Sequence, residues 1–212
     1  MKLTAEGLLA DVARLGPAAT PELRELRRGW SAMLKGVSGP EALALAQALH
    51  PRLPQERRWL AHELIRAHRG AFAAFDDIQA ERMTGQLASW YAVDAFGTLL
   101  ASPAWAAGRI SDATVEAWAR SDDRWRRRLA LVATVKLGAG GTGRTLAVCQ
   151  ALVADRDDMV VKAMSWALRE LSKHDRAAVE AFVADQGQAL AARVRREVAT
   201  KLRTGLKTPR RA

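Results

Sequence analysis

The stretch DDMVVKAMSWALRELSK, residues 157–173, indicates the fold class of this chain. Its apolar residues recur at the three- and four-residue spacing of one helix face, and they are Val161, Met164, Leu168 and Leu171. At about 100° per residue these four side chains lie on one side of a helical wheel. The stretch therefore predicts an amphipathic helix with one buried apolar face.

Trp166 lies away from that apolar face, on the same flank as the cations Lys162, Arg169 and Lys173. One interpretation is a tryptophan packed against the next helix, with basic neighbours whose charged ends reach water. The other is a surface that faces a ligand, attracts negative charge and offers a flat apolar group. The stretch by itself leaves both interpretations open.

The rest of the chain has the same helical character. Hydrophobic residues make up 49% of the 212 residues, with Ala and Leu dominant and β-branched runs nearly absent, so that the composition favours helix over strand. The patterns amount to roughly eleven or twelve helices, mostly in pairs joined by short turns. We therefore predict an all-α fold, an α-solenoid of degenerate HEAT-like antiparallel helix pairs with a concave basic face. A single domain is expected over residues 1–212.

Gly, Pro and capping residues give the expected helix ends. Gly70 and Ser102-Pro103 are both expected to stop a helix. Residues 138–143 form a glycine-rich connection, because they lack the Lys-Ser/Thr ending of a phosphate-binding loop. Residues 1–16 are expected to hold a short N-terminal helix, and residues 205–212 a basic, frayed tail. The other expected helices cover residues 22–35, 40–50, 56–68, 77–88, 89–101, 111–120, 121–137, 144–154, 157–173, 175–185 and 189–204.

The net charge of +10, with a pI of about 10.7, predicts an anionic partner. Among anionic partners, nucleic acid is favoured over an acidic protein or a membrane surface. A membrane is disfavoured because the basic residues are spread over many helices, no apolar run approaches about 18 residues, and the first residues lack an apolar signal core. We expect a cytoplasmic, nucleoid-associated monomer.

The sequence predicts no metal site and no cofactor. Cys149 is the one cysteine, so there is no internal disulfide and no cysteine metal cluster. The spacing of the histidines does not match that of metal ligands. They are His50, His62, His68 and His174.

Residues 89–101 place polar and small residues beside an apolar helix face. Trp90 lies at the edge of that face, and Asp94 follows one turn later on the same stripe. Gly97 and Ala101 continue the stripe. Either a ligand approaches through the gap that these small residues leave, or a neighbouring helix packs there. The pattern does not choose between the two.

Arg128 projects from the apolar side of the helix expected over residues 121–137, which Ser121 or Asp122 would cap. A buried arginine needs a partner, because an unpaired buried charge is strongly disfavoured. Asp94 from an adjoining helix pair is a plausible partner. Alternatively, Arg128 lies at the rim of its helix face and reaches water.

The C-terminal end is rich in basic residues, which suits contacts with phosphates, although a solvated terminus has the same composition. These residues are Arg193, Arg195, Arg196, Lys201, Arg203, Lys207, Arg210 and Arg211.

Several of these segments, taken in order, resemble the DNA alkylation repair glycosylases of the AlkD type, which are HEAT-like α-solenoids. Residues 20–24 (TPELR) resemble the family's early helix start, residues 89–94 (SWYAVD) its Trp-x-x-x-Asp segment, and residues 125–130 (WRRRLA) its Trp-x-x-Arg helix. Residues 158–173 are closely similar to its Lys-Ala-x-x-Trp-x-Leu-Arg-Glu-x-x-Lys helix, and residues 195–197 resemble its terminal Arg-Glu segment.

The resemblance covers about residues 17–202, with two departures from the family pattern. The N-terminal region is short, and Tyr91-Ala92 follow Trp90 where the family often has an acidic residue.

The resemblance implies a monofunctional DNA glycosylase that hydrolyses the N-glycosidic bond of N3- or N7-alkylated purines in double-stranded DNA, without base flipping. Asp94 would stabilise the oxocarbenium-like sugar and orient the attacking water. Trp90 and Trp166 would pack against the sugar-phosphate of the lesion, and Arg128 would hold Asp94 or a phosphate. The backbone contacts would come from Thr20, Lys162, Arg169, Lys173, Arg195 and Arg196.

Two other functions remain open on the sequence. The first is a non-catalytic solenoid that binds branched or distorted DNA. The second is a HEAT scaffold for an acidic protein, which leaves Trp166 and Arg128 unexplained.

Overall fold

The computed structural model describes residues 3–17 and 20–207, and within these ranges the chain is all-α, with no strand. The predicted fold class is therefore confirmed. The chain divides into two compact units, Met1–Ile110 and Ser111–Ala212, and each is described by itself. The single functional domain and the concave basic face stay predictions.

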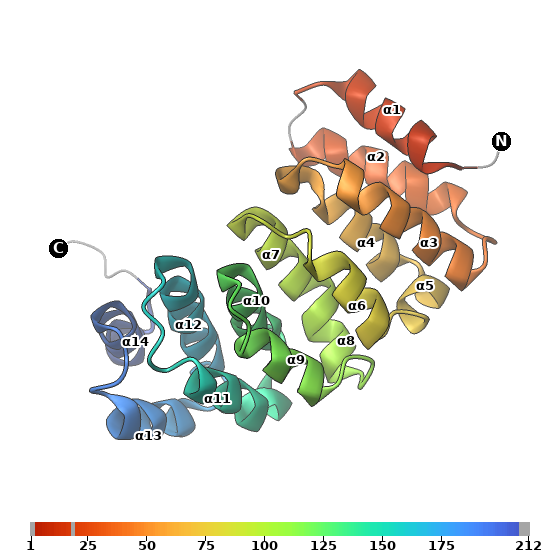
Figure 1. Ribbon diagram of the computed structural model, residues 1–212. Coiled ribbons are helices and arrows are strands. Elements are labelled where there is room, and N and C mark those ends of the chain that lie inside the picture. Colours follow the sequence, from red (N-terminus) through yellow and green to blue (C-terminus); the bar gives the residue numbers. More distant parts are fainter. Residues whose placement is uncertain (1–2, 18–19, 208–212) are drawn as a thin grey trace. The chain divides into compact units, whose positions relative to one another are not determined.

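The first unit stacks its helices in two layers (Figure 1). In one layer α4 packs between α2 and α7, and in the other α3 packs between α1 and α5. Leu60, Leu64 and Ile65 of α4 are buried, and Trp59 is half-buried. The helices are α1 (Ala5–Leu15), α2 (Thr20–Met33), α3 (Gly39–Leu49), α4 (Trp59–Ala67), α5 (Arg69–Ala73), α6 (Asp77–Thr84), α7 (Trp90–Phe96) and α8 (Ser102–Ala106).

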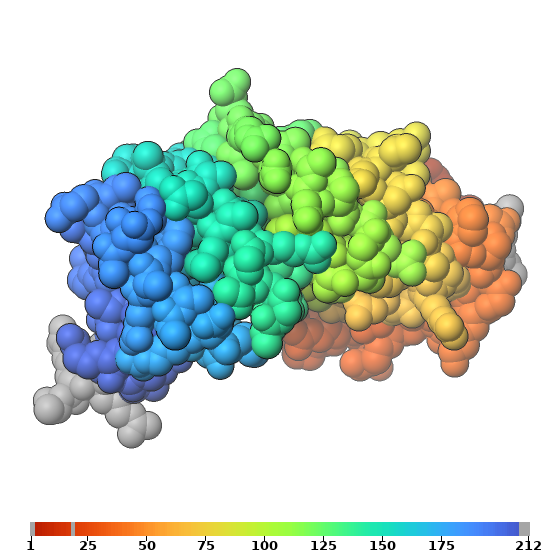
Figure 2. Space-filling view, turned by 90° about the horizontal axis from the view of Figure 1, so that it is seen from below, coloured from red at the N-terminus to blue at the C-terminus, as the bar shows by residue number. Residues whose placement is uncertain are grey.

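The second unit repeats this layering. In one layer α12 packs between α10 and α14, and α9, α11 and α13 cover these helices. The covering helices follow one another in chain order on the face seen in Figure 2, from green at α9 to blue at α13. The helices are α9 (Asp112–Ala119), α10 (Arg124–Thr134), α11 (Thr142–Ala151), α12 (Asp158–Leu171), α13 (Arg176–Gln186) and α14 (Ala192–Thr204).

The predicted stop at Ser102-Pro103 is wrong, because the chain continues from α7 into α8 through a π-helical turn, Gly97–Ala101. In that wide turn the N–H of Ser102 donates to the carbonyl of Gly97. A proline in a regular α-helix clashes with the carbonyl four residues earlier, and a wide turn before it displaces that carbonyl. Pro103 can therefore occupy the first turn of α8.

The helix expected over residues 56–68 does end before Gly70, at Ala67, but the expectation that Gly70 breaks the helical pattern is wrong, because Gly70 lies inside the short helix α5. His68 caps this helix, with its Nδ1 accepting from the N–H of Ala71 at 3.0 Å. A Cβ built on Gly39 would lie 2.5 Å from both the carbonyl carbon and the oxygen of Gly70. The two glycines therefore allow α3 and α5 to pack with their backbones in contact.

Gly39→Ala is expected to destabilise the protein by roughly 1–3 kcal/mol, the usual cost of overpacking a tight contact. The added methyl group would meet backbone atoms of Gly70, which cannot rotate away as a side chain can. The measurement is the midpoint of urea unfolding. Gly29→Ala in α2 is the matched control, because its Cβ meets open space, and alanine is favoured over glycine in a helix by about 1 kcal/mol. Equal midpoints for the two variants would contradict the prediction.

Two histidines form a buried pair in the first unit. The ring centroids of His50 and His62 are 5.1 Å apart, and the His62 ring meets the Phe96 ring edge-on at 5.3 Å. Burial, with the positive charge of Arg58, lowers the pKa of His50 from 6.5 to about 4. Burial, with the charges of His50 and Arg58, also lowers the pKa of His62 well below its usual value. Both rings are therefore held neutral.

The pKa of His50 predicts a loss of stability in acid. Above its ordinary pKa of 6.5 both the folded and the unfolded chain hold a neutral His50, and between 6.5 and the folded value of about 4 only the unfolded chain takes up the proton. Over that window the free energy of unfolding should fall by roughly 3 kcal/mol on account of His50, since one pKa unit is worth about 1.4 kcal/mol. Urea unfolding at several pH values measures it. His50→Leu should reduce the dependence and leave the part that is due to His62, whereas His174→Gln at an exposed position should not reduce it.

Candidate functional site

A pocket in the second unit brings together four of the residues singled out in the sequence. It is a cavity of about 480 Å³ between α10, α12 and α14, and we call it the Trp166 pocket. Of the described residues that line it, five are cationic and one is acidic, so the pocket attracts anions. The lining residues are Arg128, Lys162, Trp166, Arg169, Arg193, Glu197 and Lys207.

Helix α12 supplies the tryptophan and two of the cations. Asp157 caps the helix, with its side chain accepting from the N–H of Met159 at 2.8 Å. The four apolar residues of the predicted helix face are all buried. Lys162, Trp166 and Arg169 consequently emerge on the other flank and line the pocket, where the Trp166 side chain is half-buried. The amphipathic pattern thus positions the pocket wall, and the ring of Trp166 is available to a ligand.

Arg128 is buried on α10, with 6% of its surface exposed, so the interpretation that it reaches water at a rim is wrong. Its Nη1 donates to the carbonyl oxygen of Met159 at 2.5 Å, in the first turn of α12. The expected contact between Arg128 and Asp94 stays a prediction. Asp123 caps α10, with its side chain accepting from the N–H of Trp125 at 2.9 Å. The predicted cap at Ser121 or Asp122 is therefore wrong.

Glu197 on α14 organises the pocket, and sequence reasoning missed this role. Its Oε2 accepts from the hydroxyl of Ser165 at 2.6 Å, and its Oε1 accepts from Nε of Arg193 at 2.9 Å. Nε of Arg169 donates to the same Ser165 oxygen at 3.2 Å and lies 3.9 Å from Glu197 Oε2. Two sequence signals point to this network: the four-residue spacing of Arg193 and Glu197 on a helix, and the resemblance of residues 195–197 to the family's terminal Arg-Glu segment.

The charges of this network are fixed at neutral pH. Burial alone would raise the pKa of Glu197, but the hydrogen bonds from Ser165 and Arg193, with the charges of Arg193 and Arg169, outweigh burial and lower that pKa. Burial lowers the pKa of Arg169, and the carboxylate of Glu197 opposes this change. A guanidinium keeps its proton in proteins. One carboxylate therefore holds two permanent cations beside Trp166.

Helix α7 in the first unit carries the other two predicted catalytic residues. Ser89 caps it, with its hydroxyl accepting from the N–H of Ala92 at 3.3 Å. Trp90 is 44% exposed and Tyr91 is 53% exposed, and their rings stack with centroids 3.6 Å apart. Asp94 follows one turn after Trp90 and is half-buried. An exposed aromatic platform thus precedes a carboxylate on one short helix.

The small residues after Asp94 serve helix packing. Gly97 and Ala101 are both buried, and the π-helical turn that contains them packs against α4. The interpretation of a packing notch is therefore correct for these two positions, and the interpretation that they leave room for a ligand is wrong.

A family model described as DNA alkylation repair enzyme matches residues 13–202, which include α7 and the described pocket residues except Lys207. The chain belongs to this family. No match was found among curated proteins. Membership of the DNA alkylation repair family implies that DNA is the substrate of this protein.

Some predicted DNA contacts of this repair protein lie outside the Trp166 pocket. Lys173 is paired with Glu170, 2.5 Å away, and does not line the pocket. Arg195 and Arg196 are exposed on α14, also outside the pocket lining. Thr20 is exposed and is the first residue of α2. These four residues stay predictions.

The predicted basic tail contributes to the pocket through Lys207. Arg193, which the sequence placed in the general basic end, is also a lining residue. The predictions for Arg210 and Arg211, and for a frayed end over residues 208–212, lie outside the described residues.

Within the described part of the chain, no group of three or more His, Cys, Asp or Glu side chains gathers as metal ligands would. Burial raises the pKa of Cys149 to about 12, so that its thiol stays protonated and is a poor nucleophile. In the same part of the chain, none of the helices has the length and apolar character needed to cross a bilayer.

Proposed function

We propose that this DNA alkylation repair protein is a monofunctional glycosylase that hydrolyses the N-glycosidic bond of N3- and N7-alkylated purines in duplex DNA. The observation that carries the proposal is the Trp166 pocket, in which a half-buried indole stands among fixed cations. Cations bind the backbone phosphate, and the flat indole face packs against the adjoining deoxyribose. This combination suits an enzyme that contacts the sugar and phosphate of the damaged nucleotide rather than its base.

The proposed chemistry relies on charge that develops on the sugar. An alkylated purine already carries positive charge and leaves without protonation, so the transition state places positive charge on the deoxyribose. A fixed carboxylate close to that sugar stabilises the charge and orients the attacking water. Asp94 takes this role in the proposal, with Trp90 and Trp166 against the sugar-phosphate and Arg128 holding Asp94 or a phosphate.

The proposal includes no base flipping. Enzymes that flip a base read its edge by hydrogen bonds inside a fitted cavity. The lining of the Trp166 pocket is instead dominated by Lys and Arg side chains, which suit phosphate oxygens. Lys162, Arg169 and Arg193 would bind the backbone, with affinity that falls steeply as salt rises.

The test is base release from a defined duplex. The protein is incubated with a duplex that carries one 7-methylguanine or one 3-methyladenine, and with the same duplex undamaged. We expect free alkylated base by chromatography from the damaged duplexes alone. A strand break should appear after alkali treatment and not before it, because a monofunctional glycosylase leaves an intact abasic site. No release from either lesion would contradict the proposal.

The Trp166 pocket also suits a second function, the binding of branched or distorted DNA without catalysis, because its cations would hold closely spaced phosphates in either case. A four-way junction and a linear duplex of equal length distinguish the two functions. Preferential binding of the junction, together with no base release from the damaged duplexes, would favour this alternative.

A further inference from the structure

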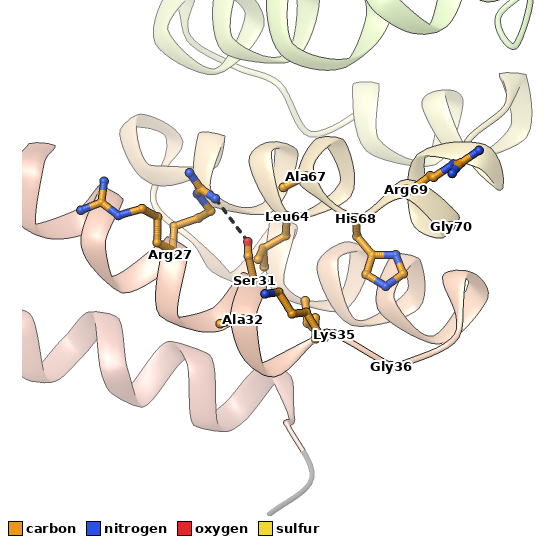
Figure 3. A pocket seen from close by; sticks show the side chains of 12 residues that line it. Arg27, Ser31, Ala32, Lys35, Gly36, Leu64, Ala67, His68, Arg69 and Gly70 are labelled. Atoms are coloured by element: carbon orange, nitrogen blue, oxygen red, sulfur yellow. Dashed lines mark hydrogen bonds between the residues drawn. The ribbon is translucent and has the colours of Figure 1, made fainter.

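A second basic hollow lies in the first unit, and none of its lining residues has been given a catalytic or DNA-binding role so far. It is a cavity of about 520 Å³ between α2 and the segment that joins α4 to α5, and we call it the α2–α4 groove (Figure 3). Six of its lining residues carry the argument: Arg27, Arg28, Ser31, Lys35, His68 and Arg69.

Three of the cations at this groove lack an anionic partner. Arg28, Lys35 and Arg69 are exposed, and among the described residues no carboxylate oxygen lies within the 4.0 Å of an ion pair with them. Arg27 differs, because its Nε lies 2.8 Å from Glu63. Cations that gather at one hollow without carboxylates repel one another, and an anionic ligand relieves that repulsion.

Two other exposed arginines of the same unit are paired, whereas Arg24 and Arg82 are exposed with no ion pair to any described residue. Arg14 lies 2.9 Å from Asp11, and Arg52 lies 2.5 Å from Glu6. The groove is therefore distinguished by the gathering of Arg28, Lys35 and Arg69 at one hollow, and not by the lack of an ion pair at any one of them.

The positions of these groups fit an extended ligand. In Figure 3, Arg27 and Arg69 lie on opposite sides of Ser31 and Lys35. The side chains do not converge on one point, as they would around a single phosphate. A sugar-phosphate backbone, which presents successive phosphates along a line, matches a row of cations.

His68 forms a neutral, fixed wall of the groove. Its Nε2 is 3.2 Å from the carbonyl oxygen of Val37, and its Nδ1 accepts from the N–H of Ala71 at 3.0 Å. One nitrogen donates and the other accepts, which is the pattern of a neutral imidazole. The positive charge of the groove thus comes from the Arg and Lys side chains.

The groove also adjoins the catalytic helix of the proposal. It opens at α2 and α4, and α4 packs on α7, which carries Trp90 and Asp94. We propose that the α2–α4 groove binds the sugar-phosphate backbone of the duplex that flanks the lesion. This inference rests on the proposed function for its partner, duplex DNA, and adds a binding site to it.

The test compares two triple variants by the salt dependence of binding to a lesion-free duplex. The groove variant is Arg28→Gln, Lys35→Gln and Arg69→Gln. The control, Arg14→Gln, Arg52→Gln and Arg82→Gln, removes the same charge from exposed residues of the first unit that do not line the groove. Each phosphate contact adds about 0.9 to the slope of log affinity against log salt, so the groove variant should lose roughly 2–3 from the slope. The control should keep the wild-type slope, and circular dichroism and urea midpoints check folding.

The outcomes separate this inference from the proposed function. Equal slopes for the folded groove variant, the control and the wild type overturn the inference, even where the wild type releases alkylated bases. A wild type that releases no base but shows the groove-dependent slope contradicts the glycosylase and supports the groove. If inorganic phosphate binds the wild type and not the groove variant while the slopes for the duplex are equal, the groove is a small-anion site and the backbone assignment is wrong.

Discussion

Asp94→Asn is expected to lower the rate of base release from a 7-methylguanine duplex by roughly 10²–10³-fold, the loss typical when one preorganised electrostatic group is removed. Asparagine keeps the size and shape of the side chain and removes its charge. The transition state carries positive charge on the deoxyribose, whereas the bound ground state carries less of it there. The change should therefore act on the chemical step far more than on binding.

The measurement for Asp94→Asn is the single-turnover rate, with affinity for the same duplex measured alongside. Affinity should stay within a few-fold of the wild type, because the cations of the Trp166 pocket are unchanged. Asp122→Asn is the matched control, since it makes the same substitution at an exposed position outside the proposed machinery. Wild-type base release by Asp94→Asn would remove Asp94 from the mechanism. Parallel losses of affinity and rate would point to a structural role.

Sequence periodicity was enough to predict the elements that carry the candidate site. The apolar residues of α12 mark its buried face, so the same pattern places Lys162, Trp166 and Arg169 on the flank that lines the pocket. Local rules succeed here because the hydrophobic effect acts on a single helix and has a fixed period. The all-α class follows in the same way from composition.

The residues that complete the pocket were beyond local rules. Glu197 meets Ser165 from 32 positions away along the chain, and periodicity within one helix does not specify which side chain of a neighbouring helix will approach it. The errors at Gly70 and Pro103 have a similar origin. The rules for these residues assume an isolated regular helix, whereas the close contact with Gly39 and the π-helical turn are features of tertiary packing.

Glu197→Gln should separate DNA affinity from the rate of base release. The substitution removes the one acidic lining residue of a pocket with five cations, so affinity for duplex DNA at low salt should stay equal or rise. It also weakens the hydrogen bonds that orient Arg193 and, through Ser165, Arg169. A misplaced phosphate contact moves the sugar relative to the carboxylate, so the single-turnover rate should fall by about 10-fold or more. Loss of charged hydrogen bonds should lower the free energy of unfolding by roughly 1–3 kcal/mol.

The matched control for Glu197→Gln is Glu180→Gln on α13. Glu180 accepts from Arg176 at the same four-residue spacing, 2.8 Å away, but lies outside the Trp166 pocket. The substitution Glu180→Gln should change neither the affinity for duplex DNA nor the rate of base release. A positioning role for Glu197 requires that the rate fall while affinity holds or rises, because a merely unstable protein loses both in proportion to its unfolded fraction. If affinity and rate both fall in Glu197→Gln, in proportion to the unfolded fraction given by its urea midpoint, the role of Glu197 is structural only. If affinity holds or rises while the rate falls, Glu197 positions the cations beside Trp166 that bind the DNA backbone.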